Sequence, residues 1–117
     1  RDKTVKLLDE CFRVMKPNGI IRICVPSLDE AAEEIRSSLA EYDKGNINDI
    51  QKYVTSEITG FNSVYSNHRW MYNFKELSGL LNESGFKEIT EYSSGVGNIS
   101  GVEFLDTRGG LFVEARK

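Results

Sequence analysis

The sequence predicts an α/β fold, and two junctions between a helix and a strand carry this prediction. In the first, apolar residues recur at helical spacing over residues 5–15, the turn-forming run 16–19 follows, and an apolar run over residues 20–25 comes next. In the second, a helical stripe over residues 74–81 leads into a strand pattern over residues 86–92. Helices that alternate with strands are typical of α/β domains.

Pro17 marks the end of the first helix. Its ring cannot continue a helix, and it also pushes Lys16 out of the helical region. Asn18-Gly19 then reverses the chain. The following run, residues 20–25, shows little polar alternation, so we expect a strand that is buried on both faces in a parallel sheet.

Two helices are expected in the middle of the chain. Ser27 with Glu30 three residues later has the spacing of a capping box, and it predicts a helix over residues 28–43. A second apolar stripe predicts a helix over residues 48–58, and the polar and aromatic residues 59–72 are expected to form an ordered loop. These two helices would form a small cap over the carboxyl end of the sheet.

The last third of the chain repeats the helix-to-strand order. Asn73 followed by Glu76 predicts the start of a helix, and Gly85 is expected to end it in a left-handed conformation. Beyond this helix we expect a strand, a loop and a last strand, which cover residues 86–92, 93–110 and 111–116.

Composition excludes several classes of function. The net charge of −3 and the isoelectric point near 5.2 argue against a nucleic-acid-binding surface. With a mean hydropathy of −0.39, the chain has no run near the roughly 20 apolar residues of a membrane span. Cys11 and Cys24 are expected to be buried, reduced thiols of a cytoplasmic protein, with a disulfide or metal role as the alternative. No Cys, His or Asp spacing predicts a metal site.

The run Glu10-Cys11-Phe12-Arg13-Val14-Met15-Lys16-Pro17-Asn18-Gly19 carries a family resemblance. It resembles the helix before the fifth strand of class I S-adenosylmethionine-dependent methyltransferases, where Glu-x-x-Arg-Val-Leu-Lys-Pro-Gly-Gly is common, and Asn18 replaces the first glycine. Residues 68–73, His-Arg-Trp-Met-Tyr-Asn, resemble His-Lys-Trp-Met-Tyr-Asp in a methyltransferase type 11 subgroup associated with polysaccharide genes. Residues 80–89 resemble the usual Leu-Leu-x-Glu-Ala-Gly-Phe junction of the family.

The resemblance implies a fold for residues 1–117 as a single domain. It makes the chain the C-terminal part of a Rossmann-like methyltransferase domain, with about four helices and three strands. These strands would be the fifth, seventh and sixth of the family, side by side in that order, with the last one in the chain antiparallel. Residues 27–67 would be a substrate-side insertion. The family's glycine-rich loop and acidic residue, which hold S-adenosylmethionine, would precede Arg1, so we expect no cofactor-binding residue here and no tight binding by this chain alone.

The candidate site lies in residues 68–72. His68 is the only histidine, and its ordinary pKa suits proton transfer near neutral pH, so it is the candidate catalytic base. Arg69 and Trp70 would hold an anionic or sugar-like substrate, and Tyr72 would hydrogen-bond it. The alternative is structural: His68 caps or packs the following helix, and Trp70 and Met71 belong to the core. Methyl transfer also needs little beyond alignment of the reactants, so a base is not obligatory.

Residues 106–108, Asp-Thr-Arg, are a weaker candidate. They resemble a Leu-Asp-x-Arg stretch of the same subgroup, and the simpler interpretation is an ion pair that orders the loop before the last strand.

Two functions from different classes remain. The first is part of an enzyme that transfers a methyl group to a small-molecule or glycan-type acceptor, with this chain alone inactive. The second is a non-catalytic dimerisation or interaction module. Without the family's fourth strand, residues 20–25 would form an exposed apolar edge, which predicts a homodimer through this strand or, second, through exchange of the N-terminal helix. A DNA-binding domain is disfavoured by the acidic charge.

Overall fold

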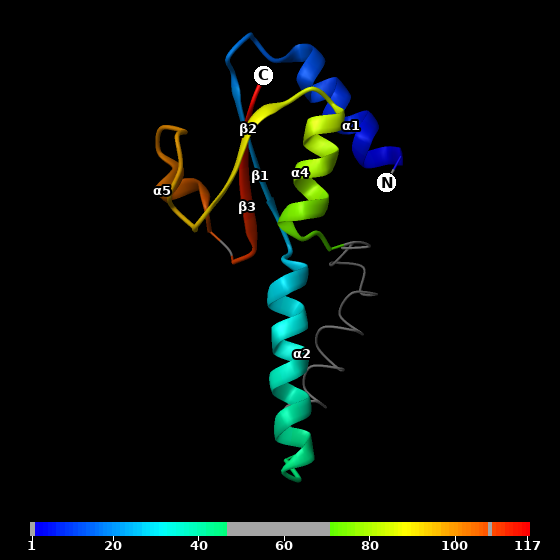
Figure 1. Ribbon diagram of the computed structural model, residues 1–117. Coiled ribbons are helices and arrows are strands. Elements are labelled where there is room, and N and C mark those ends of the chain that lie inside the picture. Colours follow the sequence, from blue (N-terminus) through cyan, green and yellow to red (C-terminus); the bar gives the residue numbers. More distant parts are fainter. Residues whose placement is uncertain (1, 47–70, 108) are drawn as a thin grey trace, which may run out of the picture. The chain divides into compact units, whose positions relative to one another are not determined.

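A computed structural model describes residues 2–46, 71–107 and 109–117 of the chain (Figure 1). These residues form a mixed α/β fold, and the predicted helix over residues 48–58 lies outside them. The described chain divides into two compact units, Ser27–Met71 and a second unit that joins Arg1–Pro26 with Tyr72–Lys117. In chain order the described elements are α1 (Asp2–Val14), β1 (Ile20–Val25), α2 (Leu28–Asp43), α4 (Phe74–Glu83), β2 (Lys87–Tyr92), α5 (Val102–Leu105) and β3 (Leu111–Arg116).

The strands form one sheet in the order β1-β3-β2. β3 runs antiparallel to both neighbours, with Ile20 of β1 opposite Arg116 and Tyr92 of β2 opposite Phe112. The predicted order, with the last strand between the other two and antiparallel, is therefore confirmed. One irregularity was not predicted: the β2–β3 register shifts between Lys87 and Thr90, and Glu88 has a φ of +49° there.

The expectation that β1 is buried on both faces in a parallel sheet is wrong for the described residues. Its pairing with β3 is antiparallel, as the strand order implied by the resemblance requires, and its residues are half-buried or, at Cys24, exposed. The reason is its place at the outside of the described sheet. The expectation of two buried thiols is also wrong, because Cys11 is half-buried and Cys24 is exposed. Cys24 alternates with Ile23 and Val25, which pack against the core, and so points to the other face of the sheet.

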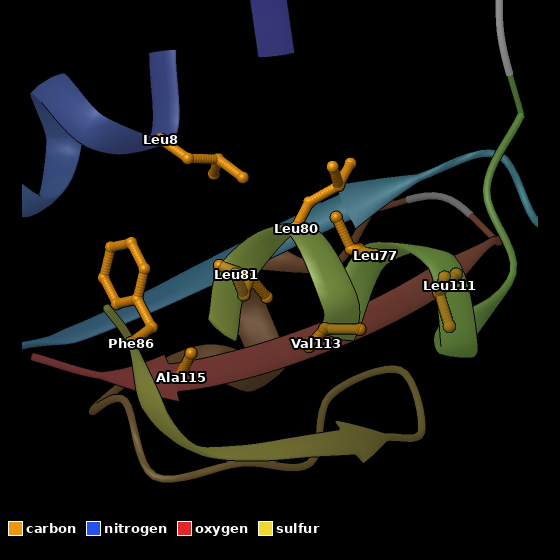
Figure 2. Close-up of a cluster of buried hydrophobic side chains, with 8 residues drawn as sticks. All are labelled: Leu8, Leu77, Leu80, Leu81, Phe86, Leu111, Val113 and Ala115. Atoms are coloured by element: carbon orange, nitrogen blue, oxygen red, sulfur yellow. The ribbon is translucent and has the colours of Figure 1, made fainter. Parts of the chain in front are cut away.

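The hydrophobic core lies on one face of the sheet, under α1 and α4. Its buried side chains come from both helices, from the junction after α4 and from alternate positions of β3: Leu8, Leu77, Leu80, Leu81, Phe86, Leu111, Val113 and Ala115 (Figure 2). Phe12 of α1 adds an edge-to-face contact with Phe86, with ring centroids 5.1 Å apart. Helices α1 and α4 lie on one side of the strands in Figure 1, and α5 lies on the other.

The helix ends follow the predicted chemistry. The Ser27 hydroxyl accepts a hydrogen bond from the Glu30 N–H at 3.2 Å, and the Asn73 side-chain oxygen accepts one from the Glu76 N–H at 2.9 Å. Gly85 after α4 has a φ of +94°, the left-handed conformation expected there. Local sequence signals therefore place α2 and α4 correctly.

Candidate functional site

Tyr72 is the one predicted site residue that the described chain contains. His68, Arg69 and Trp70 lie outside the described residues, so their predicted roles stay predictions. The Tyr72 N–H donates to the carbonyl of Pro26 at 3.5 Å, directly after β1, which places Tyr72 beside the carboxyl end of that strand.

The Tyr72 hydroxyl is held by helix α1. It lies 2.9 Å from the Thr4 hydroxyl, and the Tyr72 side chain packs against the core, half-buried. A phenol donates one hydrogen bond and accepts others, so this hydroxyl keeps capacity for a second polar partner. Tyr72 is thus fixed by two contacts, and its predicted role in substrate binding stays a prediction.

Gly110 allows the backbone to pass close to the same strand end. A Cβ atom at this position would lie 2.6 Å from the Val25 carbonyl oxygen, and the φ of Gly110 is +139°. Only glycine combines this conformation with so close an approach.

A shallow hollow of about 330 Å³ runs along α4 from Asn73, the residue after Tyr72. Its size is within the range of small-molecule sites, which is about 300–1,000 Å³. Lys75 and Glu76 line it beside Gly79, where an added Cβ would meet nothing within 4 Å. The hollow therefore offers room and charge along α4, but Tyr72 does not line it and it has no defined set of reacting groups.

The best-defined polar cluster lies on the opposite face of the sheet, away from the core. Arg22 of β1 holds Asp106 through two hydrogen bonds, from Nε at 3.1 Å and from Nη2 at 2.5 Å. Its Nη1 atom donates to Glu114 of β3 at 2.8 Å. The side chains of Arg22, Asp106 and Glu114 are only 6%, 4% and 3% exposed. We call these three residues the ion cluster.

Backbone groups of the loop after β2 complete the ion cluster. The Gly95 N–H donates to Asp106 at 2.6 Å, and the Asn98 N–H donates to the two Glu114 oxygens at 3.1 and 2.9 Å. The Asn98 side chain donates again to Glu114 at 3.1 Å. Each carboxylate thus receives donors from both the sheet and the loop, as buried charges require.

Electrostatics keep Asp106 ionised. The hydrogen bonds from Arg22 lower the pKa of Asp106, and the Gly95 N–H helps, against the opposing effect of desolvation. The same hydrogen bonds raise the pKa of Arg22. A carboxylate with a lowered pKa and occupied oxygens is a poor proton acceptor near neutral pH, so the ion cluster is suited to holding structure and not to acid–base catalysis.

A cavity of about 80 Å³ lies beside the ion cluster, lined by Tyr92, Asn98 and Glu114 among others. This volume has room for a few water molecules and is far below that of a cofactor site. Within the described ranges, no group of three or more His, Cys, Asp or Glu side chains is arranged to hold a metal ion.

An ion pair at Asp106 is present, as the simpler interpretation of residues 106–108 expected, but its partner Arg22 was not predicted. Arg108 lies outside the described residues. Arg22 and Glu114 stand directly opposite each other in the β1–β3 register. The signal for this pair was in the sequence, since each is a charged residue inside an otherwise apolar strand, but the pairing needs the sheet order.

Comparison of the chain with protein-family models, with curated proteins and with solved structures finds no match. Among the residues that the structure describes, no helix has the length and apolar character that crossing a membrane requires.

Proposed function

We propose that this chain is part of a class I S-adenosylmethionine-dependent methyltransferase that acts on a small-molecule or glycan-type acceptor in the cytoplasm. The cofactor would be held by a preceding part of a Rossmann-like domain, and this chain would supply the acceptor side. His68 is the proposed base, and Arg69, Trp70 and Tyr72 the proposed substrate-binding residues.

The strand order is the observation that supports this proposal most. An antiparallel last strand between two strands that run parallel to each other is the arrangement that the family resemblance implies. Helix α1 ends at Val14, and the Lys-Pro-Asn-Gly turn leads directly into β1, as in the resembling motif. Tyr72 at the carboxyl end of β1 fits an acceptor-side position.

Cofactor binding tests the proposal. Isothermal titration of S-adenosylmethionine into this chain should show weak or no binding, whereas a longer chain that includes the preceding coding sequence should bind stoichiometrically. Tight binding of S-adenosylmethionine by residues 1–117 would refute the proposal that a preceding part of the domain holds the cofactor. Failure of the longer chain to bind would refute the methyltransferase assignment.

The proposed roles of the site residues are tested by measuring methyl transfer. The assay uses the complete enzyme, labelled S-adenosylmethionine and a panel of glycan and small-molecule acceptors. Replacement of a general base typically costs on the order of 10²–10⁴ in rate, which is the loss expected for His68→Ala. Tyr72→Phe should lower turnover or acceptor affinity. Tyr92→Phe is the matched control, because the Tyr92 hydroxyl bonds Asn98 beside the ion cluster. Unchanged turnover in His68→Ala would remove the proposed base.

A second candidate function is a non-catalytic dimerisation module. It is favoured by the position of β1 at the outside of the described sheet, where among the described strands it pairs with β3 only. A longer chain that lacks cofactor binding but forms a stable homodimer would favour this function over the enzyme.

A further inference from the structure

The loop before β3 is attached to the sheet mainly by charge. Residues 93–107, here called the cover segment, lie on the side of the sheet opposite α1 and α4 and include α5 (Figure 1). Asp106 near the end of this segment binds Arg22, and the N–H groups of Gly95 and Asn98 near its start bind Asp106 and Glu114. Both ends of the cover segment therefore meet in the ion cluster.

Apolar anchoring of the cover segment is slight. Val102 is its buried apolar residue, at 5% exposed, and Ile99 is half-buried, whereas Val96, Phe104 and Leu105 are 54%, 81% and 61% exposed. On the other face, α1 and α4 bury an extended set of aliphatic and aromatic side chains. Burial of apolar surface is the main favourable term in folding. It stabilises the packing of α1 and α4 on one face of the sheet, whereas the cover segment on the other face depends more on hydrogen bonds and ion pairs.

The fit around the ion cluster is close. A Cβ atom added at Gly97 would lie 2.1 Å from a Glu114 oxygen and 2.6 Å from Arg22 Nη1. The guanidinium of Arg22 also lies 5.2 Å from the centre of the Phe112 ring. Neutralising one carboxylate therefore leaves buried polar groups without a charged partner, and the adjoining cavity of about 80 Å³ has room for only a few water molecules.

We propose that the cover segment is an electrostatically latched cover, which opens as a unit when a carboxylate of the ion cluster is neutralised, while the core under α1 and α4 stays folded. Opening would release the Gly95 and Asn98 amides and uncover Arg22 and Phe112. Protonation of Asp106 is the natural trigger, because Asp106 is the carboxylate by which the cover segment binds Arg22. Regions that open below the global unfolding free energy are drawn from segments with few buried apolar contacts.

The charged groups around Asp106 fix the direction of the pH effect. Arg22 of β1 and Glu114 of β3 face it, and the backbone of Glu103 within the cover segment lies against Gly95. On the same sheet face, Arg116 and Glu88 form a separate, more exposed pair. Because the folded state favours ionised Asp106, the latch is closed above the ordinary pKa of 3.8 and loosens as the pH falls below it.

Amide hydrogen exchange of this chain, resolved by residue with NMR, tests the proposal. In Asp106→Asn the Gly95 and Asn98 amides should exchange on the order of a hundredfold faster, since one charge of a buried pair is lost, while the amides of Leu80 and Leu81 keep their protection. Glu114→Gln should give the same pattern with the largest effect at Asn98. Glu88→Gln, which neutralises the more exposed Arg116 pair, is the matched control and should leave both reporters unchanged.

Two results would contradict the proposal that the cover segment opens separately from the core. The first is equal loss of protection at Gly95, Asn98, Leu80 and Leu81, because the cover segment would then open only with the whole unit. The second is unchanged protection of Gly95 and Asn98 in both carboxylate variants. In the unmodified chain, an acid titration should release Gly95 and Asn98 before Leu80 and Leu81, and the reverse order would equally contradict the proposal.

Discussion

Ser84, directly after α4, carries a buried hydroxyl that has no hydrogen-bond partner among the described residues. A buried polar group without a partner costs about 1–3 kcal/mol, so removing it is expected to help. Ser84→Ala should raise the free energy of unfolding by about 1 kcal/mol in chemical denaturation. Ser78→Ala is the matched control, because Ser78 is on the same helix and its hydroxyl bonds the Lys75 carbonyl. A loss of stability in Ser84→Ala would show that this hydroxyl has a partner in solution.

Gly97 and Gly79 should respond in opposite ways to the same substitution. A methyl group at Gly97 would collide with Glu114 and Arg22, and overpacking of this kind costs about 1–3 kcal/mol. Gly79 lies inside α4 with open space at its Cβ position, so Gly79→Ala should gain up to about 1 kcal/mol of helix propensity. Thermal unfolding of the two variants compares them directly. Equal effects would mean that the packing around Gly97 relaxes freely.

At the scale of elements, Arg22 links all three parts that meet in the ion cluster: β1, β3 and the cover segment. Replacing one partner of a buried ion pair typically costs about 3–5 kcal/mol, because the opposite charges remain buried. Arg22→Met should therefore lower the free energy of unfolding by about 3 kcal/mol. Arg13→Met, which breaks the exposed pair with Glu10 on α1, is the control and should change stability little.

The stability of the chain should also depend on pH through Asp106. The pKa of this carboxyl is lowered in the folded state, chiefly by Arg22, so its stabilising contribution is complete above the ordinary value of 3.8. It is lost as the pH falls through the lowered pKa. Denaturation curves at a series of acid pH values should show this loss, and Arg22→Met should flatten it. An equally steep dependence in Arg22→Met would assign the effect to other carboxylates.

For the whole molecule, the features that could be predicted from the sequence are those set by interactions between residues close together in the chain. Helices α2 and α4 and the turn at Gly85 were predicted because caps, apolar spacing and a left-handed glycine act between close neighbours in the chain. The strand order came from the family resemblance. α5 was missed, because its four residues are too few to set a helical period.

What the sequence did not reveal is long-range. Arg22 bonds Asp106 and Glu114, which lie more than 80 positions further along the chain. A local sequence pattern contains no information about contacts at such a separation. The same holds for the exposure of Cys24, which follows from the place of β1 in the sheet. Of the four residues proposed for the site, only Tyr72 is described. Its hydrogen bond to Thr4 could not be predicted from a local pattern either, because the two residues lie 68 positions apart in the chain.

The last prediction concerns association of this chain with itself. β1 lies at the outside of the described sheet, and its sequence, Ile-Ile-Arg-Ile-Cys-Val, contains no proline and a single charge, which the ion cluster engages. Edges of this kind pair with other strands unless they are blunted. We expect a homodimer with two β1 strands joined around a two-fold axis, and exchange of α1 is the second possibility.

Light scattering coupled to gel filtration should therefore give twice the chain mass of 13.3 kDa. Cys24 lies on β1 with an exposed side chain, so Cys24→Lys places a charge at the edge, which opposes pairing. This variant should shift the chain toward the monomer. Cys24→Ser changes the same side chain without adding charge and should stay dimeric. A monomer at high protein concentration would contradict both forms of association, and a dimer unaffected by Cys24→Lys would favour exchange of α1 over pairing of β1.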